Sequence, residues 1–200
     1  EAMLRFDVGV RRLIRPTEVV ARVADAETVI FVGGISPELE GEEKNNVHCP
    51  GFAGGDRTSI ELPLVQRDIL RALKAAGKKV VFVNCSGAAM ALVPEIESCD
   101  AILQAWYPGQ AGGTAVADVL FGDFNPCGKL PVTFYRNTDQ LPDFEDYSMK
   151  GRTYRYMTEK PIFPFGYGLS YTSFSITKGK LNRFSVKAGM GVKFTALVEN

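Results

Sequence analysis

Short apolar runs alternate with amphipathic segments from residue 17 to residue 134. Four of these runs are short, contain β-branched residues and show no polar alternation: residues 29–32, 80–83, 101–105 and 130–134. Continuous apolar runs of this length are typical of strands in a parallel sheet that is covered on both faces. We therefore predict four buried strands in this part of the chain.

Helical patterns lie between the apolar runs. Thr17 is placed to cap a first helix, which ends before Glu27. Residues 64–76 carry apolar side chains at helical spacing and are followed by Gly77, a residue type that commonly ends helices. A third helix is predicted over residues 113–120. The strand–helix–strand order predicts an α/β fold with an open, mostly parallel sheet and helices on both faces.

The pattern changes after residue 134. Residues 135–160 are polar and aromatic with little periodicity, which predicts an ordered arm. From residue 174 apolar and polar positions alternate, which predicts antiparallel strands, but too few of them to close a core. We therefore divide the chain into an α/β-sandwich domain over residues 1–134, an arm that packs on the sandwich over 135–173, and a truncated antiparallel segment over 174–200.

The composition argues against several kinds of partner. The chain is 46% hydrophobic and 23% charged, which is ordinary for a globular protein. Lys+Arg and Asp+Glu number 23 each, so no net charge attracts nucleic acid or an anionic membrane. No apolar run reaches the roughly 18–20 residues of a membrane-spanning helix. His48 is the only histidine and none of the four cysteines forms a C-x-x-C pair, so no metal site is predicted.

Three motifs, in order along the chain, resemble one enzyme family. The first is the Gly-Gly-Ile of residues 33–35 with the acidic loop behind it. The second is residues 106–134, where Gly/Pro turns flank a short Ala- and Leu-containing helix. The third combines residues 150–156 with residues 164–171. Together they resemble the C-terminal α/β-sandwich domain of glycoside hydrolase family 3, followed at residue 174 by the start of a fibronectin-III-like domain.

The resemblance implies a hydrolase, a retaining exo-β-glycosidase of the β-glucosidase or β-xylosidase type. Such an enzyme cleaves O-glycosidic bonds at the non-reducing end of β-linked xylo- or gluco-oligosaccharides. In the family, the nucleophile is an aspartate of an N-terminal (β/α)8 barrel, which is missing here, and the second domain supplies the general acid/base. The resemblance thus implies a glycoside substrate, a barrel domain as partner, and no metal or organic cofactor. It also implies a periplasmic or secreted location and no activity of these 200 residues alone. The alternative is a non-catalytic carbohydrate-binding or scaffold module.

The acidic loop, residues 35–43, is the candidate catalytic segment. Its carboxylates are Glu38, Glu40, Glu42 and Glu43. A retaining glycosidase needs a carboxylic acid that protonates the leaving oxygen and a second carboxylate roughly 5–5.5 Å away. On its own, a charge run most often forms a solvated loop. The resemblance aligns Glu40 with the family's acid/base, with Glu42 and Glu38 as alternatives, and an insertion separates the loop from the Asp-Arg pair that follows.

Two further pairs are candidates for substrate binding or loop positioning. Asp56 and Arg57 form either a local ion pair or an anchor for backbone carbonyls, and Arg57 alternatively positions the acidic loop. Arg152 and Tyr154 lie where basic and aromatic residues alternate, a pattern that stacks on sugar rings or simply packs the arm on the sandwich. Ser86 lacks the G-x-S-x-G motif, so it is not predicted to be a nucleophile.

Overall fold

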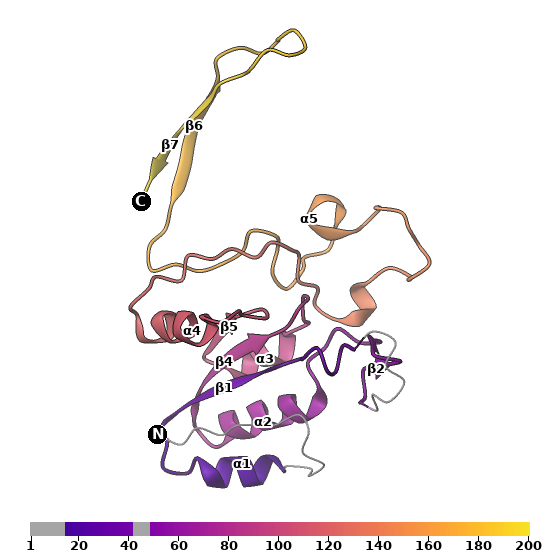
Figure 1. The fold of residues 1–200 in the computed structure, drawn as a ribbon, viewed down its shortest axis with the longest axis vertical. Coiled ribbons are helices and arrows are strands. Elements are labelled where there is room, and N and C mark those ends of the chain that lie inside the picture. Colours follow the sequence, from indigo (N-terminus) through magenta and orange to yellow (C-terminus); the bar gives the residue numbers. More distant parts are fainter. Residues whose placement is uncertain (1–14, 42–48) are drawn as a thin grey trace.

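The structure, a computed structural model, describes residues 15–41 and 49–200 (Figure 1). Its centre is a three-stranded parallel sheet in the order β1-β4-β5, formed by β1 (Thr28–Gly34), β4 (Lys79–Cys85) and β5 (Ala101–Gln104). Strand β4 pairs with β1 along its whole length and with β5 over residues 81–84. The parallel sheet predicted from the first three apolar runs is therefore confirmed.

The helices of the α/β part are α1 (Pro16–Arg22), α2 (Leu64–Ala75), α3 (Val93–Ser98) and α4 (Gly112–Phe121); η1 (Thr138–Gln140) and α5 (Thr153–Tyr156) are short helical turns of the arm. Helix α2 packs against β1 and β4, and α1 packs on α2 (Figure 1). Helix α2 ends where predicted, because Gly77 adopts φ 76°, which glycine tolerates. Thr17 is not the cap of α1. Arg15 precedes the helix without a side-chain cap, and Pro16, whose fixed φ suits a first turn, starts it.

The main apolar core lies between the sheet and α2. Phe31 and Phe82, on neighbouring strands, meet with ring centroids 5.8 Å apart, and Leu70 of α2 belongs to the same buried cluster. Strand β4 is buried on both faces. Strand β1 alternates instead, with Ile30 45% and Val32 59% exposed. The expectation that every strand is covered on both faces is thus wrong for β1, because no other described residue buries its second face.

Residues 130–134 do not form a strand of the sheet, which corrects the fourth strand prediction. Their backbone pairs with the arm instead: the Leu130 N–H donates to the Tyr167 carbonyl at 2.8 Å, and the Phe134 N–H to the Phe163 carbonyl at 2.9 Å. A proline follows Leu130, and because it has no N–H it cannot serve a central ladder. Phe134 is 1% exposed and joins the core, so the apolar character of this run reflects packing rather than a sheet strand.

Among the described residues, antiparallel strands pair in two hairpins. The short one joins β2 (Phe52–Ala53) to β3 (Asp56–Arg57), and the long one joins β6 (Ser175–Leu181) to β7 (Phe194–Glu199). Figure 1 shows the long hairpin extending away from the α/β part, and all residues of its strands are exposed. The predicted fold class, a parallel α/β sheet followed by antiparallel strands, is confirmed. Within the described residues, no helix combines the length and apolar character that a membrane crossing requires.

Candidate active site

The carboxyl ends of β1, β4 and β5 meet at one edge of the sheet, which is where open α/β sheets commonly bind ligands. Backbone hydrogen bonds align the loops that begin there. The Ile35 N–H donates to the Cys85 carbonyl at 2.9 Å, and the Ala105 N–H donates to the Asn84 carbonyl at 2.9 Å. Side chains from three separate loops are therefore brought to one edge.

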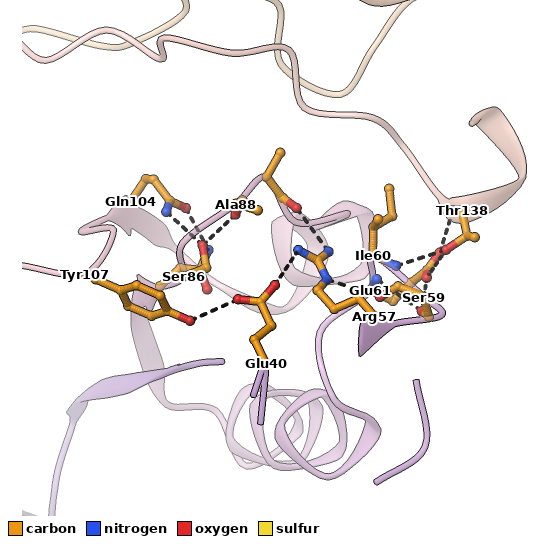
Figure 2. Close-up of polar contacts among 12 residues, drawn as sticks. Glu40, Arg57, Ser59, Ile60, Glu61, Ser86, Ala88, Gln104, Tyr107 and Thr138 are labelled. Atoms are coloured by element: carbon orange, nitrogen blue, oxygen red, sulfur yellow. Dashed lines mark hydrogen bonds and ion pairs between the residues drawn. The ribbon is translucent and has the colours of Figure 1, made fainter. Parts of the chain in front are cut away.

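Glu40 lies in the acidic loop after β1, and its carboxylate is held between two side chains (Figure 2). The Tyr107 hydroxyl donates a hydrogen bond to Oε2 at 3.2 Å, and Nη1 of Arg57 forms an ion pair with Oε1 at 3.6 Å. A backbone turn sets the starting point, since the Glu40 N–H donates to the Ser36 carbonyl at 3.0 Å. The Glu40 side chain is 24% exposed. The carboxylate is thus oriented from two other segments and is still open to solvent.

Arg57, on β3, connects the acidic loop to the loop after β4. Its Nη2 donates to the Ala89 carbonyl at 3.1 Å and its Nε to the Ser59 carbonyl at 3.4 Å. Burial lowers the pKa of Arg57, and the charge of Glu40 opposes this shift. Arg57 therefore anchors backbone carbonyls and contacts the acidic loop at the same time, while the neighbouring Asp56 is exposed.

Tyr107, which the sequence analysis did not identify, comes from the loop after β5. Burial raises the pKa of Tyr107, and the nearby Glu40 carboxylate raises it further. The phenol is therefore protonated near neutral pH and serves as a hydrogen-bond donor to Glu40. The available signal was its position two residues beyond the strand predicted over residues 101–105, at the edge where ligands gather in such sheets.

A buried amide and hydroxyl network fixes the ends of β4 and β5 (Figure 2). Asn84 Nδ2 donates to Gln104 Oε1 at 2.7 Å, and Gln104 Nε2 donates to Ser86 Oγ at 3.0 Å. The Ser86 hydroxyl in turn donates to the Ala88 carbonyl at 2.8 Å, and Ser86 is fully buried. Ser86 is therefore part of the support of the site, in keeping with its rejection as a nucleophile.

Glu61 forms a second polar cluster beside Arg57 (Figure 2). The Thr138 N–H donates to Oε1 at 2.9 Å, and the hydroxyls of Ser59 and Thr138 donate to Oε2. Burial alone would raise the pKa of Glu61, but these hydrogen bonds outweigh it and lower the pKa to about 2. With so low a pKa, Glu61 stays ionised near neutral pH and does not exchange protons there. Its hydrogen bonds instead attach the arm to the loop that follows Arg57.

Of the other carboxylates of the acidic loop, Glu38 alone is among the described residues. Glu38 is exposed at the surface, while Glu42 and Glu43 lie outside the described residues, as does His48. In the part of the chain that the structure describes, no group of three or more His, Cys, Asp or Glu side chains is arranged to hold a metal ion.

The predicted pair Arg152 and Tyr154 makes its observed contacts within the arm and with the segment before it. Arg152 Nε donates to the Ser148 carbonyl at 2.7 Å. The Tyr154 ring stacks on Phe165 with centroids 4.5 Å apart, and its N–H donates to the Thr133 hydroxyl at 3.0 Å. These contacts order the arm, and the Tyr154 side chain keeps 53% of its surface exposed.

Sequence comparison relates the chain to glycoside-cleaving proteins. Residues 11–171 match the glycosyl hydrolase family 3 C-terminal domain. The chain is 64% identical over 180 residues to a xylan 1,4-beta-xylosidase of Xylanibacter ruminicola, covering 90% of this chain and 21% of that protein. It is 41% identical over 172 residues to a periplasmic beta-glucosidase of Salmonella typhimurium, covering 80% of this chain and 21% of that protein.

Structural comparison gives the same relationship. A β-glucosidase structure from Erythrobacter marinus superposes with a TM-score of 0.73 at 37% identity, covering 92% of this chain and 24% of that one. A β-glucosidase from Listeria innocua in complex with gluconolactone gives a TM-score of 0.63 at 30% identity, covering 83% of this chain and 23% of that one. The chain thus spans 21–24% of the length of these four proteins. On the match over residues 11–171, the chain belongs to glycosyl hydrolase family 3 and carries its C-terminal domain.

Proposed function

We propose that this chain is the acid/base-bearing domain of a retaining exo-β-glycosidase that hydrolyses β-linked xylo- or gluco-oligosaccharides from their non-reducing end. The observation that carries the proposal is the setting of Glu40. Its carboxylate stands at the carboxyl edge of a parallel sheet, is partly open to solvent and is oriented by Arg57 and Tyr107. The names of the relatives, a β-xylosidase and a β-glucosidase, support the substrate class.

In the proposed reaction Glu40 acts twice. As an acid it gives its proton to the glycosidic oxygen while the bond to the anomeric carbon breaks and a carboxylate nucleophile forms a glycosyl ester. As a base it then takes a proton from water, whose oxygen attacks the anomeric carbon and releases the sugar and the nucleophile. Arg57 and Tyr107 keep the carboxylate in place through both steps.

The nucleophile, in this proposal, is an aspartate of an N-terminal (β/α)8 barrel in a longer polypeptide, called the complete glycosidase below. The chain spans only 21% of the related xylosidase, which leaves ample length for such a domain. We likewise propose that residues 174–200 belong to a fibronectin-III-like domain. We place the complete glycosidase in the periplasm or outside the cell, as the relative named a periplasmic beta-glucosidase supports.

The test is Glu40→Ala in the complete glycosidase, assayed on aryl and alkyl β-xylosides and β-glucosides. Hydrolysis of substrates with poor leaving groups should fall by roughly 10²–10⁴-fold, the usual worth of general acid catalysis. Glycosides with good leaving groups need little protonation, so their glycosylation step should change far less. Azide should restore turnover and yield a glycosyl azide, because an anion attacks the glycosyl ester without a general base.

Glu38→Ala and Glu42→Ala are the matched controls, since both change a carboxylate of the same acidic loop. Their effects should be mild and independent of the leaving group. If Glu42→Ala shows the leaving-group dependence and azide rescue in place of Glu40→Ala, the acid/base is Glu42. If none of the three variants shows them, the chain does not supply the proton donor and the non-catalytic module is the better description.

A further inference from the structure

Tyr107 is the only side chain of the loop after β5 that is seen bonded to Glu40 among the described residues. Its hydroxyl bonds to Oε2, whereas Arg57 faces Oε1 (Figure 2). The Arg57 contact, at 3.6 Å, is an ion pair too long for a hydrogen bond and does not fix direction well. The more directional restraint on the carboxylate therefore comes from Tyr107, and the Arg57 ion pair adds a less directional one.

The backbone before Tyr107 is in an unusual conformation that aims its side chain. Trp106 has φ 59°, in the left-handed region that non-glycine residues seldom occupy and that raises the local energy. Two contacts hold it there. The Trp106 ring packs edge-on against Phe134 with centroids 6.0 Å apart, and the Ala105 N–H is bonded to β4. The strained residue is thus held by its own ring and by the backbone of the residue before it.

Gly87 provides the space that the Tyr107 ring occupies. A Cβ atom added at Gly87 would lie 2.7 Å from Cε2 of the ring and 3.2 Å from Cδ2. Both distances are closer than carbon atoms normally approach, so any side chain at this position would displace the ring. The neighbouring Ser86 is held in the buried network with Gln104, which keeps the glycine under the ring.

We propose that Tyr107 is a positioning residue for the acid/base: its hydroxyl holds the Glu40 carboxylate in the orientation from which the proton passes to the leaving oxygen. This inference rests on the proposed function, in which Glu40 is the general acid. Tyr107 acts through Glu40 and has no need to touch the sugar. As the proton leaves, negative charge grows on the carboxylate, and a preorganised donor stabilises that charge more than the neutral acid.

The test is Tyr107→Phe in the complete glycosidase. The variant keeps the ring over Gly87 and removes only the hydroxyl. For substrates with poor leaving groups, kcat/KM should fall about tenfold, which corresponds to the loss of one hydrogen bond to a charged group. For substrates with good leaving groups, kcat/KM should stay near that of the unmodified enzyme. A purely structural role would lower both values by the same factor.

Gly87→Ala provides a second route to the same hydrogen bond. Because it displaces the ring, it should reproduce the leaving-group dependence of Tyr107→Phe. The double variant with Gly87→Ala and Tyr107→Phe should depend on the leaving group no more than Tyr107→Phe alone, because both changes remove the same hydrogen bond. Tyr147→Phe is the control, because Tyr147 is 90% exposed on the arm and should behave as the unmodified enzyme.

The outcomes separate the two proposals. If Glu40→Ala shows the leaving-group dependence while Tyr107→Phe changes neither class of substrate, or lowers both equally, Tyr107 is not the positioning residue and the proposed function stands. If Glu40→Ala itself shows no such dependence, the proposed function fails, and the role of Tyr107 fails with it. Both proposals are supported if the leaving-group dependence appears in three variants and is absent from the control. The three variants are Glu40→Ala, Tyr107→Phe and Gly87→Ala, and the control is Tyr147→Phe.

Discussion

The side-chain amide of Gln66, on α2, forms both of its hydrogen bonds with the backbone of Gly34, at the end of β1. The Gly34 N–H donates to Oε1 at 2.8 Å, and Nε2 donates to the Gly34 carbonyl at 2.7 Å. The approach depends on glycine at the preceding position, because a Cβ at Gly33 would lie 2.4 Å from Oε1. A core helix thus holds the residue from which the acidic loop begins.

Gln66→Ala should destabilise the chain and loosen the start of the acidic loop. It leaves the N–H and carbonyl of a buried Gly34 without their partner, which costs about 1–3 kcal/mol of unfolding free energy. Urea denaturation of the chain measures this loss. Arg71→Ala, on the same helix, removes a surface side chain paired with Asp68 and should cost less than about 1 kcal/mol. Equal effects of the two variants would contradict the role assigned to Gln66.

Gly34→Ala should be more damaging than an ordinary Gly→Ala change. Gly34 has φ 119°, and an added Cβ would lie 1.9 Å from the Cys85 carbonyl oxygen, so the backbone of β1 or β4 must move. We expect a loss of at least about 2 kcal/mol of unfolding free energy. Gly113→Ala in α4 is the matched control: nothing lies within 4 Å of its added Cβ, and the helix should gain up to about 1 kcal/mol. Similar denaturation midpoints for both variants would refute this account.

The sequence contained enough to predict the sheet but less of the site. The runs over residues 29–32 and 80–83 are apolar and rich in β-branched residues, and both form the strands predicted from that composition, β1 and β4. The run at 130–134 is also mostly apolar, but Pro131 interrupts it and its backbone pairs with the arm. Likewise, Glu40 was proposed from its loop and the family resemblance, whereas Tyr107, which bonds to it, is 67 residues away and only the sheet brings them together.

Glu61→Gln should change how stability depends on pH. The pKa of Glu61 is about 2 in the folded chain, below its ordinary value of 4.5, so the folded state favours the ionised carboxylate. The stability that this supplies is complete above the unfolded pKa and is lost as the pH falls from about 4.5 through about 2. Urea midpoints of the unmodified chain should therefore fall more steeply in this window than those of Glu61→Gln.

Two further variants check that the hydrogen bonds are the cause. Ser59→Ala and Thr138→Ala each remove a hydroxyl that donates to the Glu61 carboxylate. In each variant the urea midpoint should therefore fall less steeply with decreasing pH than in the unmodified chain. At neutral pH the Glu61→Gln chain should be less stable than the unmodified one by about 1.5–3 kcal/mol, the range for hydrogen bonds to a charged group. Identical pH profiles for the unmodified chain and Glu61→Gln would rule out a depressed pKa at this position.

The 200-residue chain alone should not hydrolyse aryl β-xylosides or β-glucosides. Glu40 supplies one carboxylate, but a retaining reaction also needs a nucleophile roughly 5–5.5 Å away, and the side chains seen bonded to Glu40 are a tyrosine and an arginine. Folding of the purified chain is verified first by circular dichroism and a cooperative urea transition. The complete glycosidase, assayed at the same molar concentration, should turn over at least one of the two substrates. Clear turnover by the folded chain that Glu40→Ala abolishes would mean that a full catalytic pair lies within these residues, and that the division between two domains is mistaken.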